Sequence, residues 1–357
     1  MTQINTLKKC RLCSEVSKAN GEDPIGSAGT YDHFLLIELP EPWSEQAVYQ
    51  HPQLGIAHKM AKALRQEAGI NARVMAIAPD YGSSPNQTRV LHYQKPVSSF
   101  AVFQKQEFLI PKTGIVPLAT ALLTQSEDIS QYDGDRQNTN HLRDLMLCTH
   151  GSYDVACGRF GYPLYRTLRN DYSTLPLRVW RCTHIGGHQF APTLLDLPRG
   201  HYWGHLEPEI LDVLVHHEGT VAELRSHYRG WAGLAWAEQI AEREIWIREG
   251  WDWLHYLKQG ETLDISDPEA DYPDWVEVRI HFRAPNGCRA GTYEARIEAG
   301  GQVETMWNSG DLTSIEAVKQ YQVSRLNLSE QPESSLAAST VTAMVHPCHN
   351  SENTLIK

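Results

Sequence analysis

Four side chains in the middle of the chain have the types and spacing of metal ligands. They are the thiols of Cys148 and Cys157 and the imidazoles of a later His-x3-His segment, His184 and His188. Two thiols and two imidazoles can hold either a zinc ion or a two-iron cluster in which histidines replace two cysteines. The sequence therefore predicts a metal centre, and the donor set alone leaves both metals open.

The two histidines are expected on a tight loop. Their spacing would place both imidazoles on one face of a helix, but Gly186 and Gly187 lie between them. Each glycine weakens a helix by about 1 kcal/mol relative to alanine, which disfavours the helix. Glycines also let the backbone pass close to a bulky inorganic group.

A second ligand set draws partly on other residues. Cys148-Thr-His150 and Cys182-Thr-His184 each have the Cys-x-His spacing of half a Rieske box. Cys148, His150, Cys182 and His184 are therefore an alternative set. A Rieske domain is a β fold with Cys-x2-His in its second box, whereas this region has an α/β pattern, so the first set is favoured.

A Cys-x2-Cys pair, Cys10 and Cys13, lies near the start of the chain and could be a redox pair or half of a zinc site. No strand-like run precedes it, and the sequence has no second pair of this kind. The 7 cysteines are spread over 357 residues, unlike the dense disulfide framework of a small secreted domain. Paired cysteines are then expected to serve as metal or redox sites in a reducing compartment.

Composition narrows the class of protein. An apolar share of 41% and a charged share of 21% are typical of a globular chain, and 357 residues suggest two or three domains. A net charge of -11 without a dense basic run argues against a nucleic-acid partner. No apolar run reaches the roughly 18 residues that cross a bilayer, and the start is polar. We therefore expect a cytoplasmic protein without a membrane partner.

Apolar runs divide the chain into an α/β lobe and a second unit that starts the same pattern again. The first lobe is predicted as residues 1–135, and a polar stretch at 131–140 is expected to be an exposed connection. Its expected strands are 33–38, 72–78, 88–93 and 100–109, and its expected helices are 56–67 and 114–123.

The second unit, residues 136–262, is expected to place both ligand pairs in loops after strands. Its expected strands are 142–147, 177–181, 193–197 and 201–205, its expected helices begin near 161 and 208, and a Trp-rich helical extension is expected over 221–259. A small β region is predicted for 263–327, followed by a disordered tail at 328–357.

Several segments resemble the sucrase/ferredoxin-like family over roughly residues 10–310. They are 148–158, His184-Ile-Gly-Gly-His-Gln-Phe-Ala191, Arg199-Gly-His-Tyr-Trp-Gly204, Tyr228-Arg-Gly-Trp231, Gly21-Glu-Asp-Pro-Ile-Gly26 and Leu35-Leu-Ile-Glu38. The resemblance implies an α/β fold in which a thioredoxin-like ferredoxin domain follows a second α/β lobe. It further implies a [2Fe-2S] cluster of the bis-histidinyl branch, with Cys148 and Cys157 on one iron and His184 and His188 on the other.

The function implied by this resemblance is electron transfer or redox sensing with a redox partner protein. Neutral imidazoles in place of two thiolates raise the potential of such a cluster, and reduction is expected to be coupled to proton uptake by the histidines. An electron carrier is favoured over a catalyst, and no carboxylate pair suggests a glycosidase. The rival functions are a zinc-stabilised interaction protein and a thiol oxidoreductase that uses Cys10 and Cys13.

Overall fold

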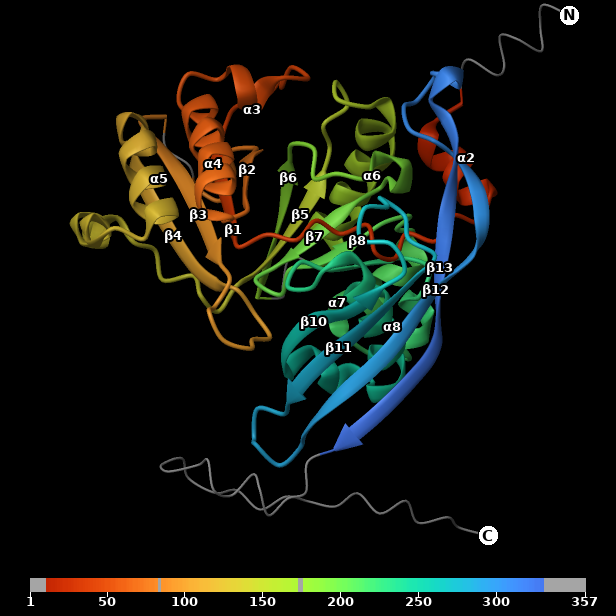
Figure 1. Ribbon diagram of the computed structural model, residues 1–357. Coiled ribbons are helices and arrows are strands. Elements are labelled where there is room, and N and C mark those ends of the chain that lie inside the picture. Colours follow the sequence, from red (N-terminus) through yellow and green to blue (C-terminus); the bar gives the residue numbers. More distant parts are fainter. Residues whose placement is uncertain (1–10, 83–84, 173–175, 331–357) are drawn as a thin grey trace, which may run out of the picture.

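The structure is a computed structural model that describes residues 11–82, 85–172 and 176–330. Within these residues the chain forms a nine-stranded mixed sheet with helices packed on it and a separate four-stranded antiparallel sheet (Figure 1). The expected α/β class with a β region at the C-terminal end is confirmed. No helix in the described ranges is both long and apolar enough to cross a membrane.

The first half of the large sheet has the strand order β4-β3-β1-β2. Strands β1 and β2 are parallel, β3 pairs antiparallel with β1, and β4 pairs antiparallel with β3. The elements are β1 (His33–Glu38), α3 (Ala47–Gln50), α4 (Leu54–Ala68), β2 (Ala72–Ile77), β3 (Gln87–Gln94), β4 (Gln104–Pro111) and α5 (Ile115–Thr124).

The second half repeats this arrangement with the order β6-β5-β7-β8, and β9 is added at the edge. Strands β5 and β6 are parallel, β7 pairs antiparallel with β5, and β8 pairs antiparallel with β7. The order of strands and helices therefore begins again, as the sequence predicted. The elements are β5 (Arg143–Cys148), α6 (Val155–Asp171), β6 (Leu177–Cys182), β7 (Leu194–Leu197), β8 (His201–Trp203), α7 (Leu211–His216) and β9 (Tyr228–Trp231).

The two half-sheets meet where β2 and β6 run antiparallel to each other. Ile77 and Cys182 are the paired residues, and Thr183 N–H donates to the Ala76 carbonyl at 2.9 Å. Hydrogen bonding is thus continuous across the boundary proposed at residue 135, and the junction lies beside the segment that carries His184.

Strand β1 shows why apolar residues fill this sheet. Leu35 and Ile37 belong to a core with helices α4 and α5, whereas Phe34 and Leu36 belong to the larger core that includes the second half. All six residues of β1 are buried because both faces of the strand are covered. A continuous apolar run is typical of such a strand.

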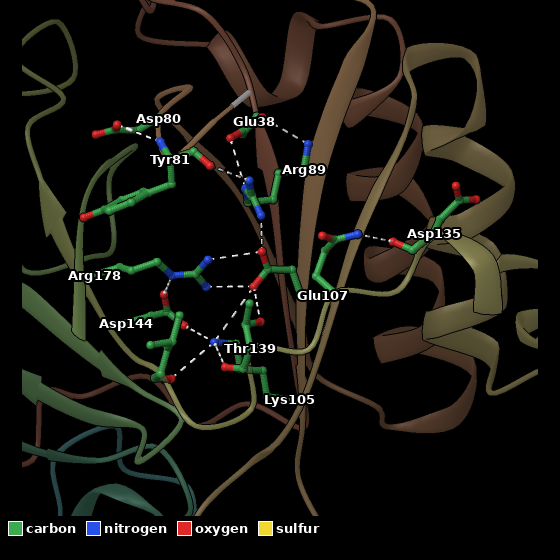
Figure 2. Close-up of polar contacts among 12 residues, drawn as sticks. Glu38, Asp80, Tyr81, Arg89, Lys105, Glu107, Asp135, Thr139, Asp144 and Arg178 are labelled. Atoms are coloured by element: carbon green, nitrogen blue, oxygen red, sulfur yellow. Dashed lines mark hydrogen bonds and ion pairs between the residues drawn. The ribbon is translucent and has the colours of Figure 1, made fainter. Parts of the chain in front are cut away.

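A buried ionic network also joins the halves (Figure 2). Arg178 of β6 donates to Glu107 of β4 at 2.7 and 3.1 Å and to Asp144 of β5 at 2.8 Å. Lys105 pairs with Asp144, and Arg89 pairs with Glu107. Burial alone would raise the pKa of both carboxyl groups, but Arg178 and the other cations lower it below the usual value. Because a buried charge is costly without its partner, we expect the loss of one of these cations to destabilise the packing of the half-sheets.

Two segments differ from the expectation. Helix α6 begins at Val155, not near 161, because the Asp154 side chain accepts a hydrogen bond from Ala156 N–H at 2.8 Å and caps the helix. The Trp-rich segment is also not helical throughout: it contains β9 before α8 (Trp236–Glu249). Gly230 in β9 has a φ of +132°, which no helix accommodates.

The C-terminal sheet has the order β10-β11-β12-β13 and packs on α8 (Figure 1). Alternate residues of β11 are buried, as a sheet with one covered face requires. The far part of β12 reaches α2 (Cys13–Ala19), where Met306 packs against Cys13. The strands are β10 (Leu257–Ile265), β11 (Trp275–Arg283), β12 (Ala290–Met306) and β13 (Ile315–Glu330).

Strand β13 extends past residue 327, and the rest of the predicted disordered tail lies outside the described residues. The remaining short segments are 3₁₀ helices: Lys112–Gly114, Glu127–Asp135, His188–Phe190, Pro208–Ile210, Val221–Leu224, Trp251–His255 and Leu312–Ser314.

Candidate metal centre

Cys148 and Cys157 are both buried, at the end of β5 and in the first turn of α6. The expectation that Cys157 lies in a loop before the helix is wrong, because Asp154 starts the helix earlier. A Cβ atom on Gly161 would lie 2.0 Å from the Cys148 carbonyl oxygen, and one on Gly158 would lie 2.9 Å from Gly151 Cα. These glycines let α6 approach the end of β5 and hold the two thiols close together.

The pKa values of the two thiols shift in opposite directions. A hydrogen bond from Cys157 lowers the pKa of Cys148 well below the usual value, against the opposing effect of burial. The same contact, together with burial, raises the pKa of Cys157 well above its usual value. The contact therefore favours the thiolate form of Cys148 over that of Cys157, and thiolates are the form in which cysteines bind metals.

His184 lies on the loop after β6 and faces the thiols. Its Nδ1 is 3.8 Å from Cys157 Sγ, and its ring stacks on Tyr153 with centroids 3.8 Å apart and planes 9° from parallel. One donor atom from each of Cys148, Cys157 and His184 lies within 4.8 Å of the others. Three of the four predicted ligands are thus brought together.

His188 follows the two glycines, whose φ angles are +91° at Gly186 and +69° at Gly187. These left-handed conformations confirm the predicted tight loop. The ring centroids of His184 and His188 are 5.3 Å apart, but His188 Nδ1 belongs to a second group. It lies 3.4 Å from Cys13 Sγ and 3.4 Å from Asp154 Oδ2. The fourth predicted ligand is therefore adjacent to the other three, with one nitrogen directed away from them.

His150 uses both ring nitrogens to hold the loops. Its Nε2 is 2.8 Å from the Ser44 carbonyl oxygen, to which it donates, and its Nδ1 accepts from His184 N–H at 3.2 Å. Cys182 is the register partner of Cys148 on the neighbouring strand, and burial raises its pKa well above the usual value. Within the described ranges, neither residue belongs to the two groups of closely spaced donors.

Of the Cys-x2-Cys pair, only Cys13 can be described, since Cys10 lies outside the described residues. Cys13 begins α2 and is buried against Asp154, His188 and Ser309. Burial raises the pKa of Cys13 to about 12, with Asp154 also raising it. A thiol of this kind is protonated at neutral pH and is a weak nucleophile.

Arg229 is a buried cation behind the histidine loop whose role the sequence did not reveal. It donates to the Gly186 carbonyl at 2.9 Å and to the Ser27 carbonyl at 2.8 Å. A Cβ atom on Gly187 would lie 2.4 Å from an Arg229 nitrogen, so glycine is needed there for close packing as well as for its φ. Burial lowers the pKa of Arg229 to about 10, and the side chain remains charged at neutral pH.

One comparison, with models of protein families, covers the part of the chain that carries these residues. The sucrase/ferredoxin-like family matches residues 24–230. A protein of Meyerozyma guilliermondii named "Altered inheritance of mitochondria protein 32" is 31% identical over 97 residues, which make up 24% of this chain and 34% of that protein. The chain thus spans about a third of that relative's length. No solved structure matches it. Because the family match covers more than half of the chain and includes all four predicted ligands, this protein belongs to the sucrase/ferredoxin-like family.

Proposed function

We propose that this protein is a [2Fe-2S] electron carrier or redox sensor. In this proposal Cys148 and Cys157 hold one iron, and His184 and His188 hold the other. The observation that carries it is the convergence of two buried thiols and an imidazole nitrogen within 4.8 Å, from the end of β5, helix α6 and the loop after β6. Buried thiols and imidazoles in one place are the donor set of a mixed-ligand two-iron cluster.

The side chains that surround the four donors support the same assignment. Nδ1 of His184 is its nitrogen near Cys157. Nδ1 of His188 is engaged by Asp154 and Cys13, which leaves Nε2 as the nitrogen for the metal. A carboxylate on the far nitrogen of a metal-binding histidine fixes its orientation and tautomer.

A bound cluster would supply one-electron transfer, at a potential raised by the two neutral imidazoles. The protein side chains would supply the proton. The far nitrogen of a ligand histidine can hold one, and Asp154 lies beside that nitrogen in His188. Reduction coupled to proton uptake at this position would give a potential that falls as the pH rises.

Access to the site favours electron exchange through the histidines. The side chains of Cys148 and Cys157 are 0% and 1% exposed, whereas His184 is half-buried and Tyr153, stacked on it, is 39% exposed. A redox partner protein would approach this side. We propose that it does so in the cytoplasm, without a nucleic-acid or membrane partner. The name of the relative refers to mitochondria, so immunoblotting of purified mitochondria and cytosol would test this location.

Metal analysis tests the proposed function. The purified protein should absorb between about 400 and 600 nm and contain two irons and two acid-labile sulfides per chain. Cys148→Ser should lose both, whereas the control Cys182→Ala should keep them. His184→Cys and His188→Cys should retain a cluster, because thiolates can replace imidazoles, with a lower and less pH-dependent potential. A colourless protein with one zinc per chain would overturn the proposal in favour of a zinc-stabilised interaction protein.

A further inference from the structure

A cavity of about 510 Å³ opens beside the candidate metal centre. Helix α4 contributes His58, Lys62 and Arg65 to its lining, and β2 contributes Arg73. His184 and the stacked ring of Tyr153 also line it. A cavity of this size is within the range of small-molecule sites.

Positive charge is concentrated in this cavity. Its lining has three permanent cations, Lys62, Arg65 and Arg73, against a single carboxylate, Glu45. Among the residues that the structure describes, neither Lys62 nor Arg65 has an ion-pair partner. The whole chain has a net charge of -11, so this excess of cations is local.

The charge in the cavity affects His58, and Arg73 is held in place by a hydrogen bond. Burial lowers the pKa of His58, and the nearby charges of Arg73 and Lys62 lower it further. Arg73 is fixed in place, because one of its nitrogens donates to the His184 carbonyl at 2.7 Å. The rings of Tyr49 and His58 pack at 79° to each other, with centroids 4.5 Å apart. The cations thus come from separate elements and surround a partly apolar, concave space.

We propose that this cavity binds a small organic anion that carries carboxylate or phosphate groups, next to His184. Arginine and lysine are the side chains that recognise such groups, through charge-assisted hydrogen bonds. A concave site with cations on two elements suits a small molecule better than the flat face of a protein partner. The inference depends only on the cavity and its charges, and holds whichever metal the four ligands bind.

Isothermal titration calorimetry of the full-length protein at low ionic strength tests this proposal, with inorganic phosphate and citrate as separate probes. One saturable site is expected for at least one probe, and the better probe identifies phosphate or carboxylate as the preferred group. Lys62→Gln and Arg65→Gln should each weaken binding by about tenfold, as expected for the loss of a hydrogen bond to a charged group. Lys62→Arg should retain most of the affinity for the probe.

Lys59→Gln is the matched control, since Lys59 is exposed on the same helix but does not line the cavity. It should change the affinity less than twofold. Equal weakening by Lys59→Gln would mean nonspecific attraction and would overturn the proposal. So would the absence of saturable binding for both probes, or saturable binding of a poly-glutamate peptide alone. Thermal unfolding of each variant checks that the fold is intact. It should be, because the side chains of Lys59, Lys62 and Arg65 are exposed.

Discussion

Asp154 Oδ2 lies 3.4 Å from Nδ1 of His188, and the same carboxylate caps helix α6, which carries Cys157. One side chain thus positions a candidate ligand from each pair. Ser309 strengthens the arrangement through its N–H and its hydroxyl, which donate to Asp154 at 2.9 and 2.7 Å. The C-terminal part of the chain therefore helps to hold the site.

Substitution of Asp154 should separate its two roles. Asp154→Ala removes the helix cap and should destabilise the protein by about 1 kcal/mol or more in urea unfolding. Asp154→Asn keeps a capping oxygen and most of this stability. It also removes the charge that favours a proton on His188 Nδ1, so the potential should begin to fall at a lower pH. Potentiometric titration across pH measures this shift, with Asp133→Asn on the exposed surface as the control. An unchanged pH profile in Asp154→Asn would rule out this positioning role.

The buried network predicts a large effect at Arg178. Arg178→Met leaves Glu107 and Asp144 buried without their shared cation, and such losses cost about 3–5 kcal/mol. Both carboxyl groups have lowered pKa values, below the usual 4.5 of Glu107 and 3.8 of Asp144. Their contribution to the free energy of unfolding is therefore present above these usual values and is lost as the pH falls through the lowered ones. The difference between Arg178→Met and the unchanged protein should therefore be larger at pH 7 than at pH 4.

Urea unfolding at both pH values measures this difference. The control is Lys18→Gln, since Lys18 pairs with Glu207 on the surface and both side chains are 51% exposed. Its effect should stay below about 1 kcal/mol. If Arg178→Met were no more destabilising than Lys18→Gln, the network would not hold the half-sheets together.

Two buried histidines, His92 and His205, and the half-buried His217 predict that the protein loses stability in mild acid. Burial lowers the pKa of His92 to about 3, of His205 to about 4 and of His217 to about 3, with nearby charges adding to it. The unfolded chain binds protons at these positions below about pH 6.5, whereas the folded chain does not. The contribution of these histidines to the free energy of unfolding is therefore complete above that pH. It falls as the pH drops from 6.5 towards 4, by on the order of 1 kcal/mol per pH unit for each histidine.

Urea unfolding between pH 7.5 and 4.5 measures the slope of the free energy of unfolding against pH. His92→Gln should reduce it by the share of one histidine, while His141→Gln, at an exposed position, should leave it unchanged. A slope unaffected by His92→Gln would show that this imidazole does not stay neutral in the folded protein.

The sequence predicted the elements that depend on local pattern and missed those that depend on distant contacts. The apolar run 33–38 coincides with β1, because both of its faces are covered and each residue had to be apolar or paired. The contact of Cys13 with His188 joins residues 175 positions apart, and no periodicity indicates it. Arg229 reaches Gly186 across 43 positions, so its role required the folded chain. The start of α6 had a local signal, the capping residue Asp154, which the prediction overlooked.

Iron content in single variants should decide between the two ligand sets that the sequence left open. His150 has both ring nitrogens engaged, by the Ser44 carbonyl and by His184 N–H, so it positions the loop and does not face the thiols. His150→Leu and Cys182→Ala should therefore keep iron and sulfide, with a shifted potential in His150→Leu as the His184 loop loosens. His184→Ala and His188→Ala should lose them.

The Rieske-like set predicts a different pattern for the same four proteins. If Cys148, His150, Cys182 and His184 were the ligands, His150→Leu and Cys182→Ala would lose iron and His188→Ala would keep it. Both sets require His184, so loss of iron in His184→Ala only confirms that the assay responds. The decisive comparison is between His150→Leu and His188→Ala, measured as iron and acid-labile sulfide per folded chain.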